Sequence, residues 1–315
     1  MNKKSRVLGG LFGLVIGDAL GVPVEGIPRA FLKKSPVKDI GHSIARRGVP
    51  PGWWSDDSSL TFCLAESLCH GFDIKDIANR FLKWLYEGYW TPAGEAFGIG
   101  LTTLNSLERI RKGEDPEKAG GSDEYSNGNG SLMRILPLAF YLENSPVEER
   151  FSSTHGVSCI THAHPRSQIA CGIYIEFAIQ LLQGGDKQSA YEGTKKSVQH
   201  FYGSDYHRGE LNHFSRILDG DIAYYDEEEI NSSGYVVDTL EASLYCFLKG
   251  KAYEDTVLMA VNLGGDTDTT AAVTGGIAGI YYGFEDIPER WVGRIAKRDE
   301  ILSLSEALYR AVYKE

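Results

Sequence analysis

The sequence predicts an all-α fold, a compact many-helix bundle that forms a single domain over residues 1–315. Two observations favour this class. Apolar residues recur every three or four positions in most of the chain, whereas the alternating patterns that indicate strands are nearly absent. In addition, 42% of the 315 residues are hydrophobic and 24% are charged, a composition that can bury a sizeable core.

Stripes of apolar residues mark the expected helices. The first lies in MNKKSRVLGGLFGLVIGDALG, which resembles a signal peptide until glycines interrupt the apolar run and Asp18 closes it, so we expect a core helix there. Asp73 is a candidate cap of one later helix, and Pro165 suits the first position of another. The later stripes are Leu60, Leu64 and Leu68; Ile74, Ile77, Phe81, Leu82 and Leu85; Phe97, Leu101, Leu104 and Leu107; Ile169, Ile173, Phe177 and Leu181; Leu240, Leu244 and Phe247; Val257 and Val261; and residues 301–312.

Three irregular stretches, residues 22–54, 113–129 and 202–234, interrupt the helices. Loops of this length inside a compact domain tend to be functional. The sequence contains no internal repeat and no low-complexity linker, so it predicts no domain boundary.

Charge and cysteine content exclude several classes of protein. The net charge of -11 provides no basic surplus for nucleic acid or an anionic membrane, although bound metal ions would reverse the local field for an anionic ligand. No uninterrupted apolar stretch reaches the roughly 20 residues of a membrane span. The five cysteines are odd in number and lack CxxC spacing, which predicts reduced thiols in a cytoplasmic protein.

Two segments far apart in the sequence are rich in small oxygen ligands. GWWSDDSS (52–59) contains Asp56 and Asp57, GGDTDTT (264–270) contains Asp266 and Asp268, and each precedes an expected helix. Helix capping explains one such side chain and the helix dipole a second at most. Four clustered carboxylates would repel one another without cations, and hard divalent cations prefer oxygen ligands. The segments therefore predict a metal site, with simple helix caps as the alternative.

Two further motifs have both a structural and a functional interpretation. The turn of Gly128, Asn129, Gly130 and Ser131 leads into an expected helix at Leu132, where backbone N–H groups would suit a phosphate. Alone, such a pattern is usually only a turn. The pair His162 and His164 is badly spaced for zinc on a helix, so a structural role is the simpler interpretation.

Six segments together resemble the ADP-ribosylglycohydrolase family. They are GLVIGDALGVPVEG (13–26), GWWSDDSS (52–59), NGNGSLMR (127–134), THAHPRS (161–167), GYVVDTLEA (234–242) and NLGGDTDTTAAVTGGIAGIYYG (262–283). They occur in the family's order, and the resemblance covers most of the chain, roughly residues 8–283. The resemblance implies an all-helical fold with a binuclear magnesium or manganese centre, and these ligands do not distinguish the two metals.

The resemblance also implies roles for individual residues. The implied metal ligands are Ser55, Asp56, Asp57, Asp266, Asp268 and Thr269. Glu25 and Asp57 are the leading candidates for proton transfer. Asn129, Gly130 and Ser131 would contact the diphosphate or ribose, His162 would lie near the same groups, Tyr235 would line the adenosine end, and His164 would only pack. The chain departs from the family where Ser55 and Ser58 replace threonine, and where Ser126 stands in place of an acid that some relatives carry, which leaves the general base open.

The implied reaction is hydrolysis at the anomeric carbon of the distal ribose, which removes ADP-ribose from a protein or a small conjugate. Similarity to the bacterial enzyme that reactivates dinitrogenase reductase favours the arginine linkage, with serine-linked and O-acetyl-ADP-ribose substrates as alternatives. The further alternatives are a non-catalytic ADP-ribose-binding relative, an immunity protein that also blocks a toxin, and a nucleoside hydrolase, whose α/β fold the helical pattern does not support. We expect a monomer with no nucleic-acid or membrane partner.

Overall fold

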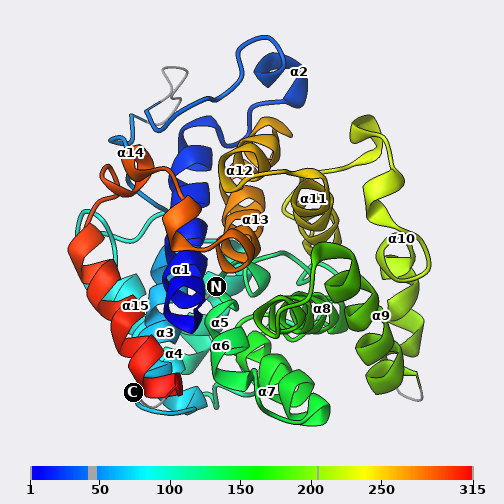
Figure 1. Ribbon diagram of the computed structural model, residues 1–315. Coiled ribbons are helices and arrows are strands. Elements are labelled where there is room, and N and C mark those ends of the chain that lie inside the picture. Colours follow the sequence, from blue (N-terminus) through cyan, green and yellow to red (C-terminus); the bar gives the residue numbers. More distant parts are fainter. Residues whose placement is uncertain (1, 42–47, 204–205, 314–315) are drawn as a thin grey trace.

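The computed structural model describes residues 2–41, 48–203 and 206–313. These residues form helices joined by loops and contain no strand; the β-type pairing among them is limited to isolated bridges between Gly121 and His162 and between Gly128 and Tyr235. The predicted all-α fold class is therefore confirmed (Figure 1).

The helices follow one another through the whole described chain. The α-helices are α1 (Lys3–Gly21), α2 (Arg29–Leu32), α3 (Asp56–Leu68), α4 (Ile74–Glu87), α5 (Leu101–Arg111), α6 (Pro137–Leu142), α7 (Val147–Cys159), α8 (Pro165–Leu182), α9 (Lys187–Tyr202), α10 (Ser215–Leu218), α11 (Val236–Lys249), α12 (Tyr253–Asn262), α13 (Thr267–Tyr282), α14 (Glu289–Val292) and α15 (Arg298–Tyr313). Short 3-10 helices are η1 (Val22–Val24), η2 (Leu132–Arg134), η3 (Tyr206–Phe214), η4 (Ile222–Tyr224), η5 (Glu227–Glu229) and η6 (Phe284–Asp286).

Helices α1 and α13 lie side by side in the middle of the molecule, with α15 on one side and α11 on the other (Figure 1). Their backbones touch because α1 carries a glycine at every fourth position of the facing stripe. A methyl group on Gly17 would lie 2.1 Å from the carbonyl oxygen of Ala271, and one on Gly21 would lie 2.4 Å from the backbone nitrogen of Asp268. The stripe consists of Gly9, Gly13, Gly17 and Gly21. This close packing brings the end of α1 against the beginning of α13.

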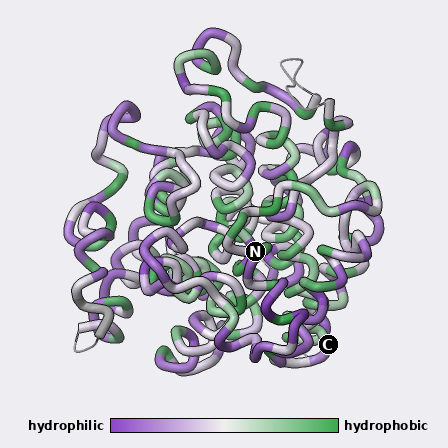
Figure 2. The backbone as a smooth tube through the Cα atoms, turned by 180° about the vertical axis from the view of Figure 1, so that it is seen from behind, coloured by the Kyte–Doolittle hydropathy of each residue, from purple (hydrophilic) through white to green (hydrophobic). Residues whose placement is uncertain are grey.

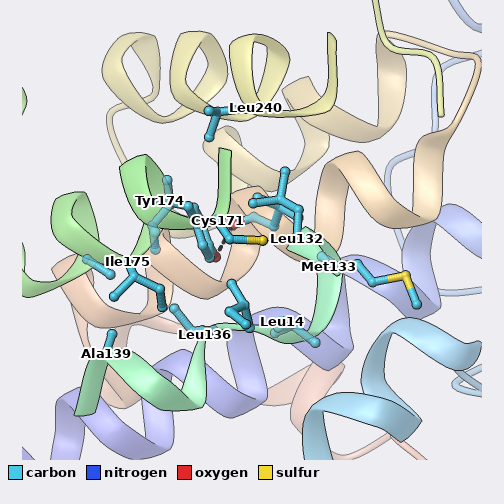
Figure 3. Packing of buried hydrophobic residues seen from close by; sticks show 14 of the residues in the cluster. Leu14, Leu132, Met133, Leu136, Ala139, Cys171, Tyr174, Ile175 and Leu240 are labelled. Atoms are coloured by element: carbon cyan, nitrogen blue, oxygen red, sulfur yellow. Dashed lines mark hydrogen bonds between the residues drawn. The ribbon is translucent and has the colours of Figure 1, made fainter. Parts of the chain in front are cut away.

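The hydrophobic core surrounds this helix pair. Figure 3 shows Leu14 of α1, Leu136 just before α6 and Tyr174 of α8 packed together. These three parts of the chain therefore share one hydrophobic interior. The hydroxyl of Tyr174 donates to the carbonyl of Val273 in α13 at 2.8 Å. Hydrophobic stretches lie mainly in the interior of the molecule, and hydrophilic stretches lie mainly at its periphery (Figure 2).

The N-terminal helix has its expected role. By length and composition, Lys3–Val24 could cross a membrane, but every residue of its most apolar window is buried inside the protein. Such burial is what a core helix requires, and the predicted interpretation of this segment agrees with the structure.

Several local predictions are also tested by the structure. Asp73 caps α4 by accepting from the backbone N–H groups of Lys75 and Asp76, and α8 begins at Pro165, as predicted. All five cysteines are free thiols. The prediction of a longer helix from Leu132 was wrong, because only the three-residue η2 forms there. The next helix, α6, begins at Pro137, whose nitrogen has no hydrogen to donate to the preceding turn.

The prediction of an apolar helix face that begins with Phe97 was also wrong in part. Phe97 precedes α5, and Leu101 is 76% exposed, whereas Thr103 and Ser106 are buried. The inner face of α5 is therefore partly polar, because this helix borders a polar cavity rather than the hydrophobic core alone.

Candidate active site

The end of η1, the beginnings of α3, α5 and α13 and the loop before η2 line a polar cavity of about 340 Å³. This volume lies within the range of small-molecule sites. The cavity is lined by Glu25, Asp56, Asp57, Gly98, Gly100, Leu101, Thr102, Thr103, Gly128, Asn129, Gly130, Met133, His162, Gly234, Asp266, Asp268 and Thr269. Residues separated by most of the chain therefore share one small space.

Asp18 supports the acidic turn at the start of α3. This carboxylate is fully buried and accepts hydrogen bonds from the backbone N–H groups of Ser55 (3.0 Å) and Ser58 (3.1 Å) and from the hydroxyl of Ser58 (2.6 Å). The Ser55 hydroxyl accepts from the N–H of Asp57 at 3.3 Å. Since Asp18 and Ser55 satisfy the first amides of the helix, Asp56 and Asp57 are not needed as caps, and both line the cavity.

The second acidic turn is held by backbone contacts. Gly264 and Gly265 have φ angles of 75° and 72°, which glycine adopts without strain. The N–H of Gly265 donates to the carbonyl of Ile27 at 2.9 Å, and that of Asp266 donates to the carbonyl of Ser232 at 2.8 Å. The Asp266 side chain does not cap α13; its Oδ2 accepts from Asn129 Nδ2 at 2.8 Å. As at the start of α3, helix capping does not account for the acidic residue Asp266 that begins this turn.

The two turns meet inside the cavity. The Thr269 hydroxyl donates to Oδ2 of Asp57 at 3.4 Å, and the Ser55 hydroxyl donates to the same oxygen at 3.0 Å. Asp268 lies 5% exposed on the same cavity wall. The residues predicted to share a site are thus brought together.

The raised pKa values of the buried aspartates indicate a site that favours a bound cation. Burial and the neighbouring carboxylate of Asp18 raise the pKa of Asp56 to about 8 and raise the pKa of Asp57 well above its ordinary value. Burial and Asp266 raise the pKa of Asp268 in the same way. Burial alone raises the pKa of Asp18 to about 6, against the effect of its hydrogen bonds. Four carboxyl groups in one buried site would retain protons unless a cation replaced them.

The donors fit a hard divalent cation. Oδ1 of Asp57 is buried and has no hydrogen-bond partner among the described residues. An acceptor in this state lacks a compensating donor or cation. Carboxylate and hydroxyl oxygens make up the predicted ligand set, which is the chemistry that Mg²⁺ and Mn²⁺ prefer. Within the described residues, however, no group of three His, Cys, Asp or Glu side chains has the spacing of a metal-ligand cluster.

Glu25 lies on the cavity wall beside both turns. It ends η1, and its negative charge is among the causes of the raised pKa values of Asp56 and Asp268. The adjacent Gly26 donates its N–H to the carbonyl of Gly265 at 2.7 Å, which fixes the loop against the second turn. The predicted proton-transfer candidates Glu25 and Asp57 thus border the same space.

Asn129, Gly130 and His162 also line the cavity, and Asn129 is in direct contact with one of the acids. Asn129 Nδ2 bridges Asp266 Oδ2 and the Thr239 hydroxyl at 2.8 and 2.9 Å. A methyl group on Gly130 would lie 2.7 Å from Cε1 of His162, so glycine keeps this turn close to the ring. The turn lacks the helix dipole expected for a phosphate site, since only η2 follows it.

Three predicted residues lie outside the cavity wall. Ser55 stands behind Asp57, as described above. Ser131 is fully buried, where its hydroxyl contacts Cys171 Sγ at 3.4 Å and accepts from Ser158 at 2.9 Å. Tyr235 is half-buried next to Arg166 and does not line the cavity. The contacts of Ser131 and Tyr235 with a substrate stay predictions. His164 caps α8 by accepting from the N–H of Arg166, consistent with its predicted structural role.

Sequence reasoning missed three contributors to the site. Asp18 was seen only as the end of an apolar run, although an isolated acid in such a run signals a buried partner. Arg134, which lies beneath His162, follows the Gly-Asn-Gly turn without any periodic signal. The wall segment 98–103 was assigned to an apolar stripe, and only its two glycines hinted at close contact: a methyl group on Gly98 would lie 2.4 Å from Asp56 Oδ1.

The chain is similar to known proteins in both its sequence and its fold. The family model described as ADP-ribosylglycohydrolase matches residues 1–315. The chain is 31% identical to the ADP-ribosylarginine hydrolase Tri1 of Serratia proteamaculans (strain 568), with 96% of this chain and 79% of the relative covered. It is 28% identical to the ADP-ribosyl-[dinitrogen reductase] glycohydrolase of Rhodospirillum rubrum, with 94% and 92% covered. A solved structure titled ADP-ribosylglycohydrolase-related protein complex superposes with a TM-score of 0.82 at 35% identity and covers 98% of both chains.

Proposed function

The chain belongs to the ADP-ribosylglycohydrolase family, and we propose that it is a metal-dependent hydrolase that removes ADP-ribose from modified arginine side chains of proteins. The single observation that carries the proposal is the cavity shared by the two acidic turns, in which the Thr269 hydroxyl bonds Asp57. The arginine linkage is supported by the 31% identity with a protein named as an ADP-ribosylarginine hydrolase.

The metal part of the proposal assigns the six predicted oxygen ligands to two divalent cations, Mg²⁺ or Mn²⁺. The ligands would be Ser55, Asp56, Asp57, Asp266, Asp268 and Thr269. When bound, such cations lower the pKa of water and orient ligand oxygens. The unpaired Oδ1 of Asp57 and the raised carboxyl pKa values support this assignment. A bound cation would give Oδ1 a partner and would stabilise the ionised carboxylates in place of protons.

The remaining chemistry belongs to the protein side chains. Glu25 or Asp57 would accept a proton from the attacking water, because both carboxylates line the cavity. Glycoside cleavage passes through an oxocarbenium-like transition state, whose positive charge the surrounding carboxylates would stabilise. Asn129 and the backbone of Gly130, which line the same cavity, would bind the sugar and diphosphate.

The test is hydrolysis of matched ADP-ribosyl-arginine and ADP-ribosyl-serine peptides, with EDTA and after return of Mg²⁺ or Mn²⁺. We expect release of ADP-ribose from the arginine peptide, loss with EDTA and recovery with metal. Glu306→Gln, a surface carboxylate variant on α15, is the control for nonspecific charge effects. Activity that survives EDTA would overturn the metal assignment, and preference for the serine peptide or an O-acetyl ester would overturn the arginine assignment. Binding of ADP-ribose without hydrolysis of any substrate would favour a non-catalytic relative.

A further inference from the structure

Arg134 is a buried cation that forms no direct ion pair among the described residues, although the negative charge of Asp56 acts on it from farther away. Its side chain is 0% exposed, and its guanidinium donates to the carbonyl of Gly130, to the carbonyl of Val157 at 3.4 Å and to the hydroxyl of Thr161 at 2.8 Å. The guanidinium carbon lies 4.7 Å from the centre of the Phe81 ring. No ion pair involves it within the described ranges 2–41, 48–203 and 206–313. Burial lowers its pKa to about 10, so the group remains charged at neutral pH.

Burying a charge without a counter-ion is costly, and its retention calls for a physical reason. The position of Arg134 suggests one. It lies directly behind the cavity wall, since its contact Gly130 lines the cavity and its contact Thr161 precedes the wall residue His162.

Thr161 connects the arginine with the histidine. Its Oγ1 accepts from Arg134 Nη2 at 2.8 Å and lies 2.8 Å from Nδ1 of His162. A guanidinium can only donate, so this contact uses an acceptor position of the hydroxyl. The hydroxyl hydrogen then needs an acceptor, and Nδ1 of His162 is its partner among the described contacts. A hydrogen bond from Thr161 to Nδ1 satisfies this hydrogen, and it is the direction on which the inference rests.

A hydrogen bond in this direction would determine the tautomer of His162. A neutral imidazole carries one hydrogen, and with Nδ1 as acceptor that hydrogen must be on Nε2. Burial and the charge of Arg134 lower the pKa of His162 to about 3, so the ring is neutral over the physiological range. His162 lines the cavity, and Nε2 donates to no described residue. A methyl group on Gly128 would lie 3.8 Å from Nε2, so this nitrogen faces the glycine turn of the cavity wall.

We propose that Arg134 is a positioning residue of the active site, which acts through Thr161 to hold His162 as a neutral donor with its Nε2–H directed into the cavity. The acceptor is an oxygen of the bound ligand; its identification as a hydroxyl or phosphate oxygen of an ADP-ribosyl group rests on the proposed function. The ligand thus receives a hydrogen bond of fixed direction from a neutral imidazole instead of from a charged imidazolium. Burial, with the charge of Arg134 as the second cause, lowers the pKa of His162 and keeps its ring neutral. Hydrogen bonds in such a chain also strengthen one another.

The test compares Thr161→Val with Thr161→Ser. Valine has a similar shape but neither accepts from Arg134 nor donates to Nδ1, whereas serine retains both contacts. The matched control is Thr154→Val, a fully buried threonine on α7 whose hydroxyl donates only to the carbonyl of Arg150. The tautomer is measured by long-range ¹H–¹⁵N correlation spectra of the His162 ring, and the affinity for ADP-ribose is measured by calorimetry.

We expect the Nε2–H tautomer in the wild type, in Thr161→Ser and in Thr154→Val. Thr161→Val should show an increased Nδ1–H population, and its ADP-ribose affinity should fall about threefold to tenfold, the worth of one oriented hydrogen bond. Arg134→Met should shift the tautomer in the same direction, because Thr161 then loses the donor that orients it. If Thr161→Val fails to fold, Arg134→Met tests the same chain of contacts, and an unchanged tautomer and affinity in Arg134→Met would overturn the positioning role.

An Nδ1–H tautomer in the wild type would overturn the proposal. So would a Thr161→Val protein that keeps both the Nε2–H tautomer and wild-type affinity. The spectra are recorded on ligand-free protein, so they do not depend on any activity. A wild type that has the expected tautomer but neither binds ADP-ribose nor hydrolyses its conjugates would contradict the proposed function and leave the positioning role of Arg134 intact.

Discussion

The hydroxyl of Thr269 lies 3.4 Å from Oδ2 of Asp57, although 212 positions separate the two residues in the sequence. Each belongs to the first turn of a helix, and the contact exists because α13 packs against α1, whose Asp18 in turn holds the start of α3. The acidic cluster is therefore a product of helix packing, and its properties can be tested through the packing as well as through the acids.

Asp57→Asn should reduce hydrolysis by about 100-fold or more, as expected for the loss of a proton-transfer or cation-binding carboxylate. In metal-free protein the same change should increase the free energy of unfolding by about 0.5–2 kcal/mol, because the amide needs no proton to be neutral, whereas the buried carboxyl group must take up a proton at neutral pH. Steady-state kinetics and thermal melts in EDTA measure the two effects. An active enzyme, or a variant less stable than the wild type in EDTA, would contradict this view of Asp57.

The stability of the metal-free protein should fall as the pH rises from about 5 to 8.5. Asp18 and Asp56 have an ordinary pKa of 3.8, which the fold raises to about 6 and about 8. Between these values the folded protein binds more protons than the unfolded chain, so the protonated, stable form is lost as the pH rises. Melts in EDTA across this range measure the effect. Mg²⁺ or Mn²⁺ should raise the melting temperature more at pH 8 than at pH 5.5, because cations and protons compete for the same carboxylates. An equal effect of metal at both pH values would argue against the cluster as the binding site.

Asp18→Ala should destabilise the protein by about 2–4 kcal/mol, since it leaves buried donors of Ser55 and Ser58 without an acceptor. It should also reduce activity, although Asp18 does not line the cavity. Asp73→Ala is the matched control: it removes an exposed cap of α4, and we expect a loss of about 1 kcal/mol with unchanged activity. Chemical denaturation and kinetics distinguish the two variants. Wild-type activity in Asp18→Ala would show that the start of α3 keeps its geometry without this carboxylate.

Gly13→Ala should destabilise the protein by about 3 kcal/mol or more, because the new methyl group would lie 2.3 Å from the carbonyl oxygen of Gly275 and force α1 away from α13. Gly156→Ala on α7 is the control. Its methyl group would lie 3.6 Å from Ile74 Cδ1, an ordinary contact, and the better helix propensity should stabilise the protein by about 0.5–1 kcal/mol. Equal melting temperatures for the two variants would contradict the close helix contact.

Local patterns were sufficient for much of the architecture. The cap at Asp73, the start of α8 at Pro165 and the core helix at the N-terminus follow from short-range rules for capping, proline and apolar periodicity. These rules depend on neighbours within one or two turns, so the sequence contains the necessary information. They failed at Leu132 and along α5, where a downstream proline and a polar cavity changed the outcome.

The sequence by itself determined that the protein is helical, which family it resembles and that two short turns concentrate the carboxylates. Only the tertiary structure decided that these turns face one cavity, that Asp18 rather than Asp56 satisfies the start of α3, and that Ser131 points into the core. The physical reason is distance along the chain. A side chain's direction and partner depend on helices brought together by packing, and the glycine stripe of α1 sets that packing through contacts with residues more than 200 positions away.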